Sequence, residues 1–282
     1  MRSIRRFWPL IKELQTGLLL FTGLAGFLSA APLAGNGLTL LALAGSLFLA
    51  ISGSTVLNMA YDADIDAVMK RTCWRPLPRE LVTVREATLL GAAMAALGVG
   101  WALLLAPLYG LIVFAGIFFD VAVYTVWLKR RTPYAVIVGG LAGGMPVLAG
   151  RTLAIGQIDL VGLLLALGVL LWIPTHIMTF AMRHFDDYQA AHVPTLPAAY
   201  GFYATRVVIA VSSLAAALVM GWAAAVIGAA VGLLAALGVL GLGLLGLAML
   251  GIVRPSPQAS FALFKYASLY MGVAMLVIAA AV

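Results

Sequence analysis

Charged residues are scarce in this sequence of 282 residues. Asp, Glu, Lys and Arg together make up 10% of the chain, against roughly 25% in an average soluble domain. Hydrophobic residues make up 64%, and the mean hydropathy is +1.10. So few polar side chains cannot cover a water-soluble surface, which excludes a soluble globular protein and predicts an integral membrane protein.

The chain also has only one cysteine and three histidines, and it lacks the sequence pattern of β-strands. The single Cys73 lies in a connection that we expect to be cytoplasmic, so no internal disulfide can form and the thiol stays reduced. The three histidines lack the Cys/His spacing of a zinc site. The sequence shows no alternation of polar and apolar residues, which favours a helical bundle over a barrel.

Long apolar runs, by contrast, recur along the chain. Nine of them approach the roughly 20 residues that a helix needs to cross a bilayer. The predicted spans are residues 14–33, 38–60, 86–106, 108–128, 134–152, 160–182, 205–226, 229–252 and 259–281. Two connections, 61–85 and 184–204, are long and lie four spans apart. We therefore expect an all-α polytopic membrane protein, a single membrane domain over 1–282, with two four-helix halves plus one helix and two functional loops.

The distribution of Lys and Arg predicts the orientation. If the N-terminus is cytoplasmic, 15 of the 17 basic residues lie inside; the outer connections hold only Arg151, and Lys265 falls within the ninth span. The first apolar run is of full span length and no clear cleavage site follows, so we expect no cleaved signal peptide. The prediction is a multi-pass protein of the cell (inner) membrane, with both long loops cytoplasmic and the C-terminus outside. Anionic lipid or an anionic ligand explains the net charge of +7 without nucleic acid.

The first long loop concentrates acidic residues: five of the chain's ten lie between positions 62 and 86. Asn58, Asp62 and Asp66 are spaced i, i+4, i+8, so on a helix all three share one face. Asp64 points the other way, and we expect it to cap the loop or to pair with Arg71 or Arg75.

Oxygen ligands of this kind select hard cations such as Mg²⁺, which is held by one or two carboxylates together with substrate phosphates. Lys70, Arg71 and Arg75 follow the acidic row and suit phosphate oxygens. The alternative is a solvated loop of mixed charge. Acidic residues at the end of an apolar span are costly, and therefore favour a metal–phosphate site.

The second long loop repeats this arrangement more weakly. His176, Phe180, Arg183 and Asp187 fall on one helical face, and Pro174 should kink the sixth span just before His176. Asp187 is the candidate for a second metal-binding carboxylate. By itself His176 is better explained as a partner in an interhelical hydrogen bond.

A third polar stretch ends the fourth span. Arg130 and Arg131 are expected to anchor the helix at the membrane surface. Lys129 and Tyr124 are candidates to reach the pyrophosphate end of a ligand. Asp120 lies deeper in the bilayer and needs a partner, for which His176 and Tyr124 are candidates.

Four motifs in the chain are similar to those of one family. They are Asn58-x-x-x-Asp62-x-x-x-Asp66 with Met69-Lys70-Arg71-Thr72-x-x-Arg75-Pro76-Leu77, then Tyr124-Thr125-x-x-Leu128-Lys129-Arg130, then Trp172-x-Pro174-x-His176, and Asp187-Tyr188-x-x-Ala191-x-Val193-Pro194-x-Leu196-Pro197. They resemble motifs of the UbiA-type intramembrane prenyltransferases, and within these most of all the protoheme IX farnesyltransferases, also called heme O synthases.

The resemblance implies a nine-helix UbiA-type bundle that transfers a farnesyl group from farnesyl diphosphate to the vinyl group of heme B, giving heme O. Mg²⁺, as two ions with the diphosphate, would be held by Asn58, Asp62, Asp66 and Asp187. The positive side chains of Lys70, Arg71, Arg75 and Lys129, with Tyr124, would bind the diphosphate and stabilise departing pyrophosphate. His176 would position the acceptor or accept a proton. A heme-biosynthesis or oxidase-assembly partner is a further possibility.

The chain departs from the family pattern at Thr175, Ile177 and Met178, which surround His176, and at Ala191. These departures leave other acceptors open. A related enzyme would prenylate an aromatic or quinone precursor, or another prenyl diphosphate would serve as donor; an intramembrane terpene cyclase would need no acceptor. An ion-coupled transporter is disfavoured, because its acidic residues would lie near the membrane midplane.

Overall fold

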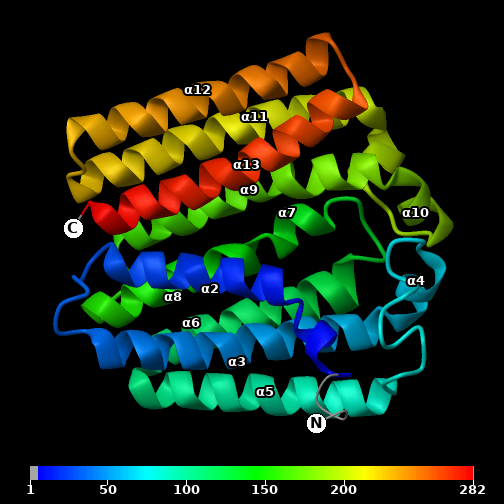
Figure 1. Cartoon of the computed structure of the whole chain (residues 1–282), viewed down its shortest axis with the longest axis horizontal. Coiled ribbons are helices and arrows are strands. Elements are labelled where there is room, and N and C mark those ends of the chain that lie inside the picture. The colour runs from blue at the N-terminus through cyan, green and yellow to red at the C-terminus, as the bar shows by residue number, and fades with distance from the viewer. Residues whose placement is uncertain (1–5, 282) are drawn as a thin grey trace.

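The computed structural model describes residues 6–281, in which every regular element is helical (Figure 1). In chain order the elements are η1 (Trp8–Ile11), α2 (Glu13–Leu28), α3 (Gly37–Tyr61), α4 (Ala63–Val68), α5 (Val84–Leu105), α6 (Pro107–Ile117), η2 (Phe118–Leu128), α7 (Ala135–Gly139), α8 (Leu141–Ile155), α9 (Leu160–Arg183), α10 (Phe185–Ala190), α11 (Leu196–Ile227), α12 (Val231–Val253) and α13 (Pro257–Ala280).

The long helices lie roughly parallel to one another and form two groups (Figure 1). In the first group α3, α5, α6 and α8 pack together, and in the second α9, α11, α12 and α13 do. Helix α2 packs on both α8 and α13, and it contributes Ala25 to one hydrophobic core and Phe27 to the other. The ninth predicted span was expected to be the additional helix, but it is α13, which packs within the second group. The helix outside both four-helix groups is instead α2, the first span.

The prediction of nine spans is not confirmed. Within residues 6–281, eight helical segments are long and apolar enough to cross a membrane. The predicted first span corresponds to α2, whose 16 residues rise roughly 24 Å, less than the roughly 30 Å hydrocarbon thickness. Lys12, in a left-handed conformation, separates α2 from η1, and the helix ends at Leu28, a few residues before Pro32.

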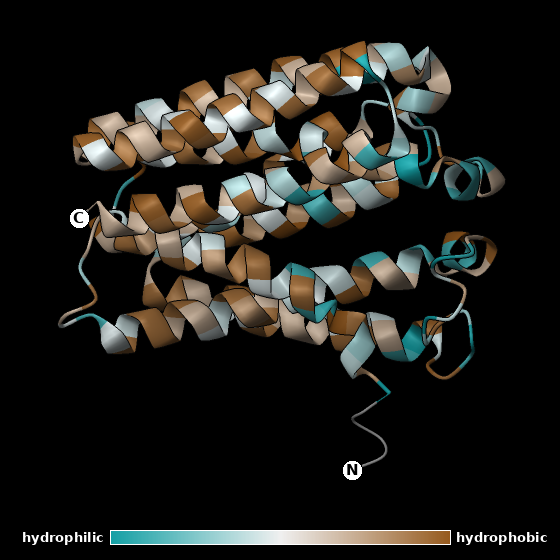
Figure 2. Ribbon diagram, turned by 45° about the horizontal axis from the view of Figure 1, so that its top comes forward, coloured by the Kyte–Doolittle hydropathy of each residue, from teal (hydrophilic) through white to brown (hydrophobic). Residues whose placement is uncertain are grey.

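The two long connections meet at one end of the bundle, which we call the capped end because α4 and α10 cover it (Figure 1). Hydrophobic residues run along the helices, whereas hydrophilic residues gather at this end (Figure 2). The predicted loop 184–204 contains α10 and the first turn of α11, which kinks at Gly201 (φ 79°).

Helices α2 and α8 approach each other closely through glycine. A Cβ atom at Gly150 would lie 1.9 Å from the carbonyl oxygen of Gly23, and one at Gly26 would lie 2.1 Å from that of Val147. Only glycine permits this spacing. Because lipid gives helices no hydrophobic drive to associate, such close backbone contact is a main source of packing energy in a membrane.

A buried ion pair joins the helices at the opposite end of the bundle. Arg151 on α8 donates to both carboxylate oxygens of Asp159, which caps the N-terminus of α9, and to the backbone and hydroxyl oxygens of Ser29 after α2. All three of its guanidinium nitrogens donate hydrogen bonds, and its side chain is 11% exposed. Arg151, which the sequence marked only as an outer basic residue, thus connects three helices.

Replacing Arg151 with alanine is expected to lower the free energy of unfolding by about 3 kcal/mol, because it leaves Asp159 and Ser29 without their partner. Thermal unfolding of the purified chain would measure the loss. Any activity that depends on the capped end should stay unchanged well below the unfolding temperature, since the pair lies at the opposite end of the bundle. An unaltered melting temperature would contradict this structural role.

Candidate active site

The row Asn58, Asp62 and Asp66 keeps its predicted spacing across a helix boundary. Helix α3 ends at Tyr61, Asp62 is the capping residue between α3 and α4, and Asp66 lies in α4. The Asp62 amide still donates to the Asn58 carbonyl at 3.0 Å, and the Asp66 amide to the Asp62 carbonyl at 2.8 Å. The chain therefore remains helix-like through the boundary.

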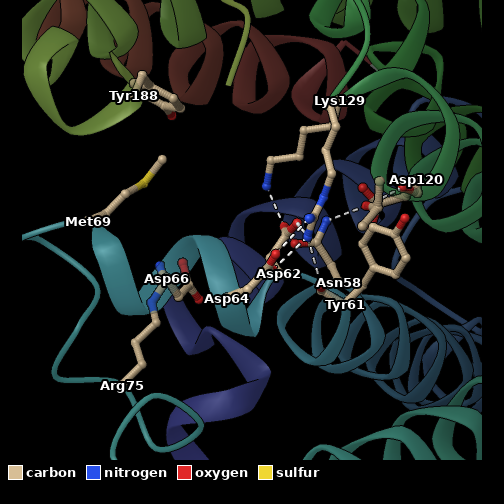
Figure 3. Close-up of polar contacts among 12 residues, drawn as sticks. Asn58, Tyr61, Asp62, Asp64, Asp66, Met69, Arg75, Asp120, Lys129 and Tyr188 are labelled. Carbon is tan, nitrogen blue, oxygen red and sulfur yellow. Dashed lines mark hydrogen bonds and ion pairs between the residues drawn. The ribbon is translucent and has the colours of Figure 1, made fainter. Parts of the chain in front are cut away.

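Both acidic side chains of this row are buried beside cations (Figure 3). Asp62 is 3% exposed and its Oδ2 accepts a hydrogen bond from the Lys129 ammonium; Asp66 is 5% exposed and both its oxygens accept from Arg75, at 2.9 and 2.7 Å. Buried charges need such partners. Asp62 Oδ1, however, is buried without any hydrogen-bond partner.

Asp64 lies on the other side, as its spacing predicts, but the expected partner was wrong. It pairs with Arg130 through two hydrogen bonds of 2.7 Å, and not with Arg71 or Arg75. Hydrogen bonding from Arg130 lowers the pKa of the exposed Asp64 carboxyl. Arg130, predicted to be a simple membrane anchor, also donates to the Tyr61 carbonyl and so holds the end of η2 against the end of α3.

Tyr124 lies in η2, an 11-residue π-helix, and Lys129 is the residue that caps its C-terminus. Such helices are rare and frequently occur at functional sites. Burial opposes a charge on Lys129, yet the pKa of its ammonium is raised, because the Tyr124 oxygen and the Asp62 carboxylate lie beside it. Lys129 therefore stays protonated and carries its charge into the acidic row.

Asn58 belongs to a polar network within the first group of helices. Its Nδ2 donates to Thr125 at 2.7 Å, and its Oδ1 lies 3.4 Å from the Lys12 ammonium. Asp120 accepts from the Ser54 hydroxyl at 2.6 Å. We predicted His176 or Tyr124 as the partner of Asp120, and that prediction was wrong. The partner of this intramembrane acid is Ser54 of α3.

Asp187 joins the two loops. Its carboxylate accepts from the backbone amides of Lys70 and Arg71, at 3.2 and 3.4 Å. The Arg71 guanidinium lies over the rings of Phe180, at 5.0 Å, and Tyr188, at 5.5 Å. Asp187 of the second loop therefore lies beside the basic residues of the first loop. The side chain of Lys70 itself remains exposed.

His176 lies apart from these contacts. Its ring stacks between Trp172, at 4.8 Å, and Phe264 of α13, at 4.5 Å, and its Nδ1 is 3.2 Å from the Ser268 hydroxyl. The interpretation as a partner in an interhelical hydrogen bond agrees with this position. The structure brings it beside α13, not beside an aspartate.

A small cavity of about 30 Å³ lies under the loops, between η2, α9 and the start of α11. Tyr124, Lys129 and Tyr188 contribute its polar groups. Its other walls are mainly apolar, among them Val136, Ile177, Met178, Ala181 and Leu196. One charged side chain, Lys129, and two tyrosines therefore lie beside a mainly apolar interior.

Comparison with known proteins agrees with this geometry. The sequence profile of the UbiA prenyltransferase family matches residues 19–272. The chain belongs to the UbiA prenyltransferase family. It is therefore a multi-pass membrane prenyltransferase, and the resemblance of its motifs is confirmed.

Relatives of this UbiA-family chain include protoheme IX farnesyltransferases. That of Archaeoglobus fulgidus is 41% identical over 201 residues, covering 71% of this chain and 70% of the relative; that of Korarchaeum cryptofilum is 42% identical, covering 72% and 69%. Among solved structures, a digeranylgeranylglyceryl phosphate synthase superposes with a TM-score of 0.83 at 18% identity, covering 100% of this chain and 99% of the other. An Archaeoglobus fulgidus UbiA homologue bound to GPP and Mg²⁺ superposes with a TM-score of 0.71 at 14% identity, covering 97% and 99%.

The donor groups of this UbiA-family site fit Mg²⁺. Within residues 6–281 no three His, Cys, Asp or Glu side chains converge as a protein-only metal cage. Mg²⁺ needs no such cage, since one or two carboxylates suffice when substrate phosphates complete its coordination. The buried Oδ1 of Asp62, which accepts no hydrogen bond and lies 3.9 Å from the Arg130 guanidinium, is the oxygen best suited to this role.

Sequence reasoning missed Lys12 as a member of the UbiA-family site. It counted this residue only among the 15 basic residues on the cytoplasmic side. Burial, with Arg75 and Lys129 nearby, lowers the pKa of Lys12 to about 8, and its ammonium faces Asn58. The one feature of the sequence that could have indicated this role is the position of Lys12 just before the first apolar run. Lysines that only anchor a helix at the membrane surface often occupy the same position.

Proposed function

We propose that this chain transfers a farnesyl group from farnesyl diphosphate to the vinyl group of heme B and so forms heme O. The observation that carries the proposal is the acidic and basic cluster of the capped end, set above an apolar cavity. The acceptor and the prenyl group are inferred from the relatives, which are protoheme IX farnesyltransferases.

Asn58, Asp62, Asp66 and Asp187 would hold Mg²⁺ against the diphosphate. When bound, the metal would supply positive charge to the phosphate oxygens. Lys129 and Arg75 already lie beside Asp62 and Asp66, so their positive charges can share the same oxygens. Arg71 and Lys70, fixed through their amides by Asp187, would add charge from the other side.

The reaction would break the bond between the allylic carbon and the diphosphate oxygen, and the electron pair would leave with pyrophosphate. Pre-placed cations stabilise that developing charge without reorganising, which is usually the largest contribution to catalysis. The allylic cation would remain among apolar walls that exclude water. The heme vinyl group would then supply the electron pair of the new carbon–carbon bond; water would add to the resulting cation, and a proton would be released.

The capped end would face the cytoplasm of a cell membrane, because 15 of the 17 Lys and Arg residues lie on that side of the predicted spans. Farnesyl diphosphate, which is water-soluble at its head, would then reach the loops from the cytoplasm. A heme-biosynthesis or oxidase-assembly partner would dock on the same face.

A reconstituted assay with farnesyl diphosphate, Mg²⁺ and heme B, read by mass spectrometry, tests the proposal. We expect heme O to form, and to form only when Mg²⁺ is present. Pyrophosphate release with unmodified heme B would reject heme as the acceptor and leave an aromatic acceptor or a cyclisation. Release of no pyrophosphate from any allylic diphosphate would contradict prenyl transfer itself.

A further inference from the structure

A second cavity, of about 120 Å³, lies between α9 and α13 near the capped end. The rings of Phe180, Phe261 and Phe264 line it, with Arg183, His184 and Ser260 at its polar side. Phe264 also stacks on His176, so aromatic rings continue from this slot along α9 into the bundle. The slot therefore suits a flat, conjugated ligand.

Two cations flank one wall of the slot. The Arg183 guanidinium lies 4.0 Å from the Phe261 ring centre, and the Lys265 ammonium lies 4.4 Å from the same ring. Within residues 6–281 neither takes part in any of the ion pairs with carboxylates. Lys265 is also an exposed charge eight residues inside α13, where a charged residue usually serves a function. The pair can accept anionic groups of a ligand.

The slot borders the diphosphate cluster through Arg71. This guanidinium lies over Phe180, which lines the slot, and over Tyr188, which lines the cavity under the loops. Its Nε is buried without a hydrogen-bond partner. A ligand in the slot and the head of a prenyl diphosphate would therefore occupy neighbouring sites on either side of Arg71.

We propose that the α9–α13 slot holds the carboxylate-bearing edge of the acceptor, with aromatic rings against its flat face and with Arg183 and Lys265 paired to its carboxylates. The assignment rests on the proposed function, since heme B is a flat macrocycle that carries a pair of carboxylates on one edge. Arg183 and Lys265 are thus positioning residues, which orient the vinyl groups and take no part in bond making.

Heme B titrations of the full chain, in nanodiscs of zwitterionic lipid, test this assignment. Arg183→Gln and Lys265→Gln should each weaken heme B binding roughly tenfold, and the double variant more. Farnesyl diphosphate binding with Mg²⁺ should not change. The dimethyl ester of heme B, which lacks the free carboxylates, should bind the wild type weakly and the double variant no worse. Lys265→Arg should restore most of the affinity for heme B.

Arg206→Gln is the matched control, because Arg206 also lies over a phenylalanine, Phe202, but outside the slot; it should bind heme B as the wild type does. Unchanged heme B affinity in folded Arg183→Gln and Lys265→Gln variants would overturn the assignment, while heme O formation would leave the proposed function intact. Loss of affinity only in nanodiscs containing anionic lipid would also overturn it and identify a lipid headgroup site. If the wild type binds no heme B, the proposed acceptor and the slot assignment both fail.

Discussion

Asp62→Ala is expected to lower kcat/KM for the prenyl diphosphate by about 10²–10³-fold. Asp62 is buried; its Oδ2 accepts a hydrogen bond from Lys129, whereas its Oδ1 accepts none and lies 3.9 Å from the Arg130 guanidinium. Its removal would take away the candidate metal oxygen and leave the Lys129 charge unbalanced. Mg²⁺-dependent binding of the diphosphate, measured by titration calorimetry, should weaken in parallel.

Asp64→Ala provides the matched control for this prediction. Asp64 is two residues away and equally acidic, but its side chain is 65% exposed and engaged by Arg130. Its loss should change kcat/KM less than threefold, as is usual for exposed ion pairs. Asp62→Asn, which preserves size, should fold normally and still lose activity. Similar losses for Asp62→Ala and Asp64→Ala would refute the assignment of the buried oxygen to the metal.

Asp187→Asn is expected to lower kcat/KM by about 10²-fold. The Lys70 and Arg71 amides donate to different oxygens of Asp187, and the single amide oxygen of asparagine can still accept from one of them, so part of the contact between the loops should persist while the negative charge is lost. Asp187→Ala removes both the charge and the contact between the loops. In this variant residues 69–82 of the first loop should become more sensitive to protease. Steady-state kinetics and limited proteolysis together separate the two roles of Asp187.

Asp186→Asn is the control for the second loop, since Asp186 neighbours Asp187 but is exposed. We expect its kinetics to stay within twofold of the wild type. If Asp187→Asn were equally silent, Asp187 would serve only to hold the loops together and the proposal of a metal-binding carboxylate in the second loop would be wrong.

The long helices could be predicted from the sequence because their signal is local. Each apolar run fixes a helix of its own, since unsatisfied backbone groups are too costly in lipid. Eight predicted spans agree with helical segments to within several residues, apart from α11, which begins nine residues early with the turn before Gly201. The prediction for the first span was wrong at its C-terminal end, because α2 stops at Leu28, a few residues before Pro32, and not at residue 33.

Pairings between helices could not be predicted in the same way. Asp64 pairs with Arg130, Asp120 with Ser54, and Asn58 with Thr125. Each pair joins residues more than sixty positions apart, and several basic residues near the loops were equally plausible partners by sequence. Which partner each residue has depends on which helices pack together and on how far along each helix the residue lies.

The sequence by itself determined a helical membrane protein, the family, and the row of acidic residues with its spacing, since composition, periodicity and motif are properties of the chain taken locally. Only the tertiary structure decided which cation neutralises which carboxylate, that Asp187 bridges two loops, and that Arg183 and Lys265 share one aromatic wall. Electrostatic and aromatic contacts act over a few ångströms, so they are fixed only when packing brings distant helices to that distance.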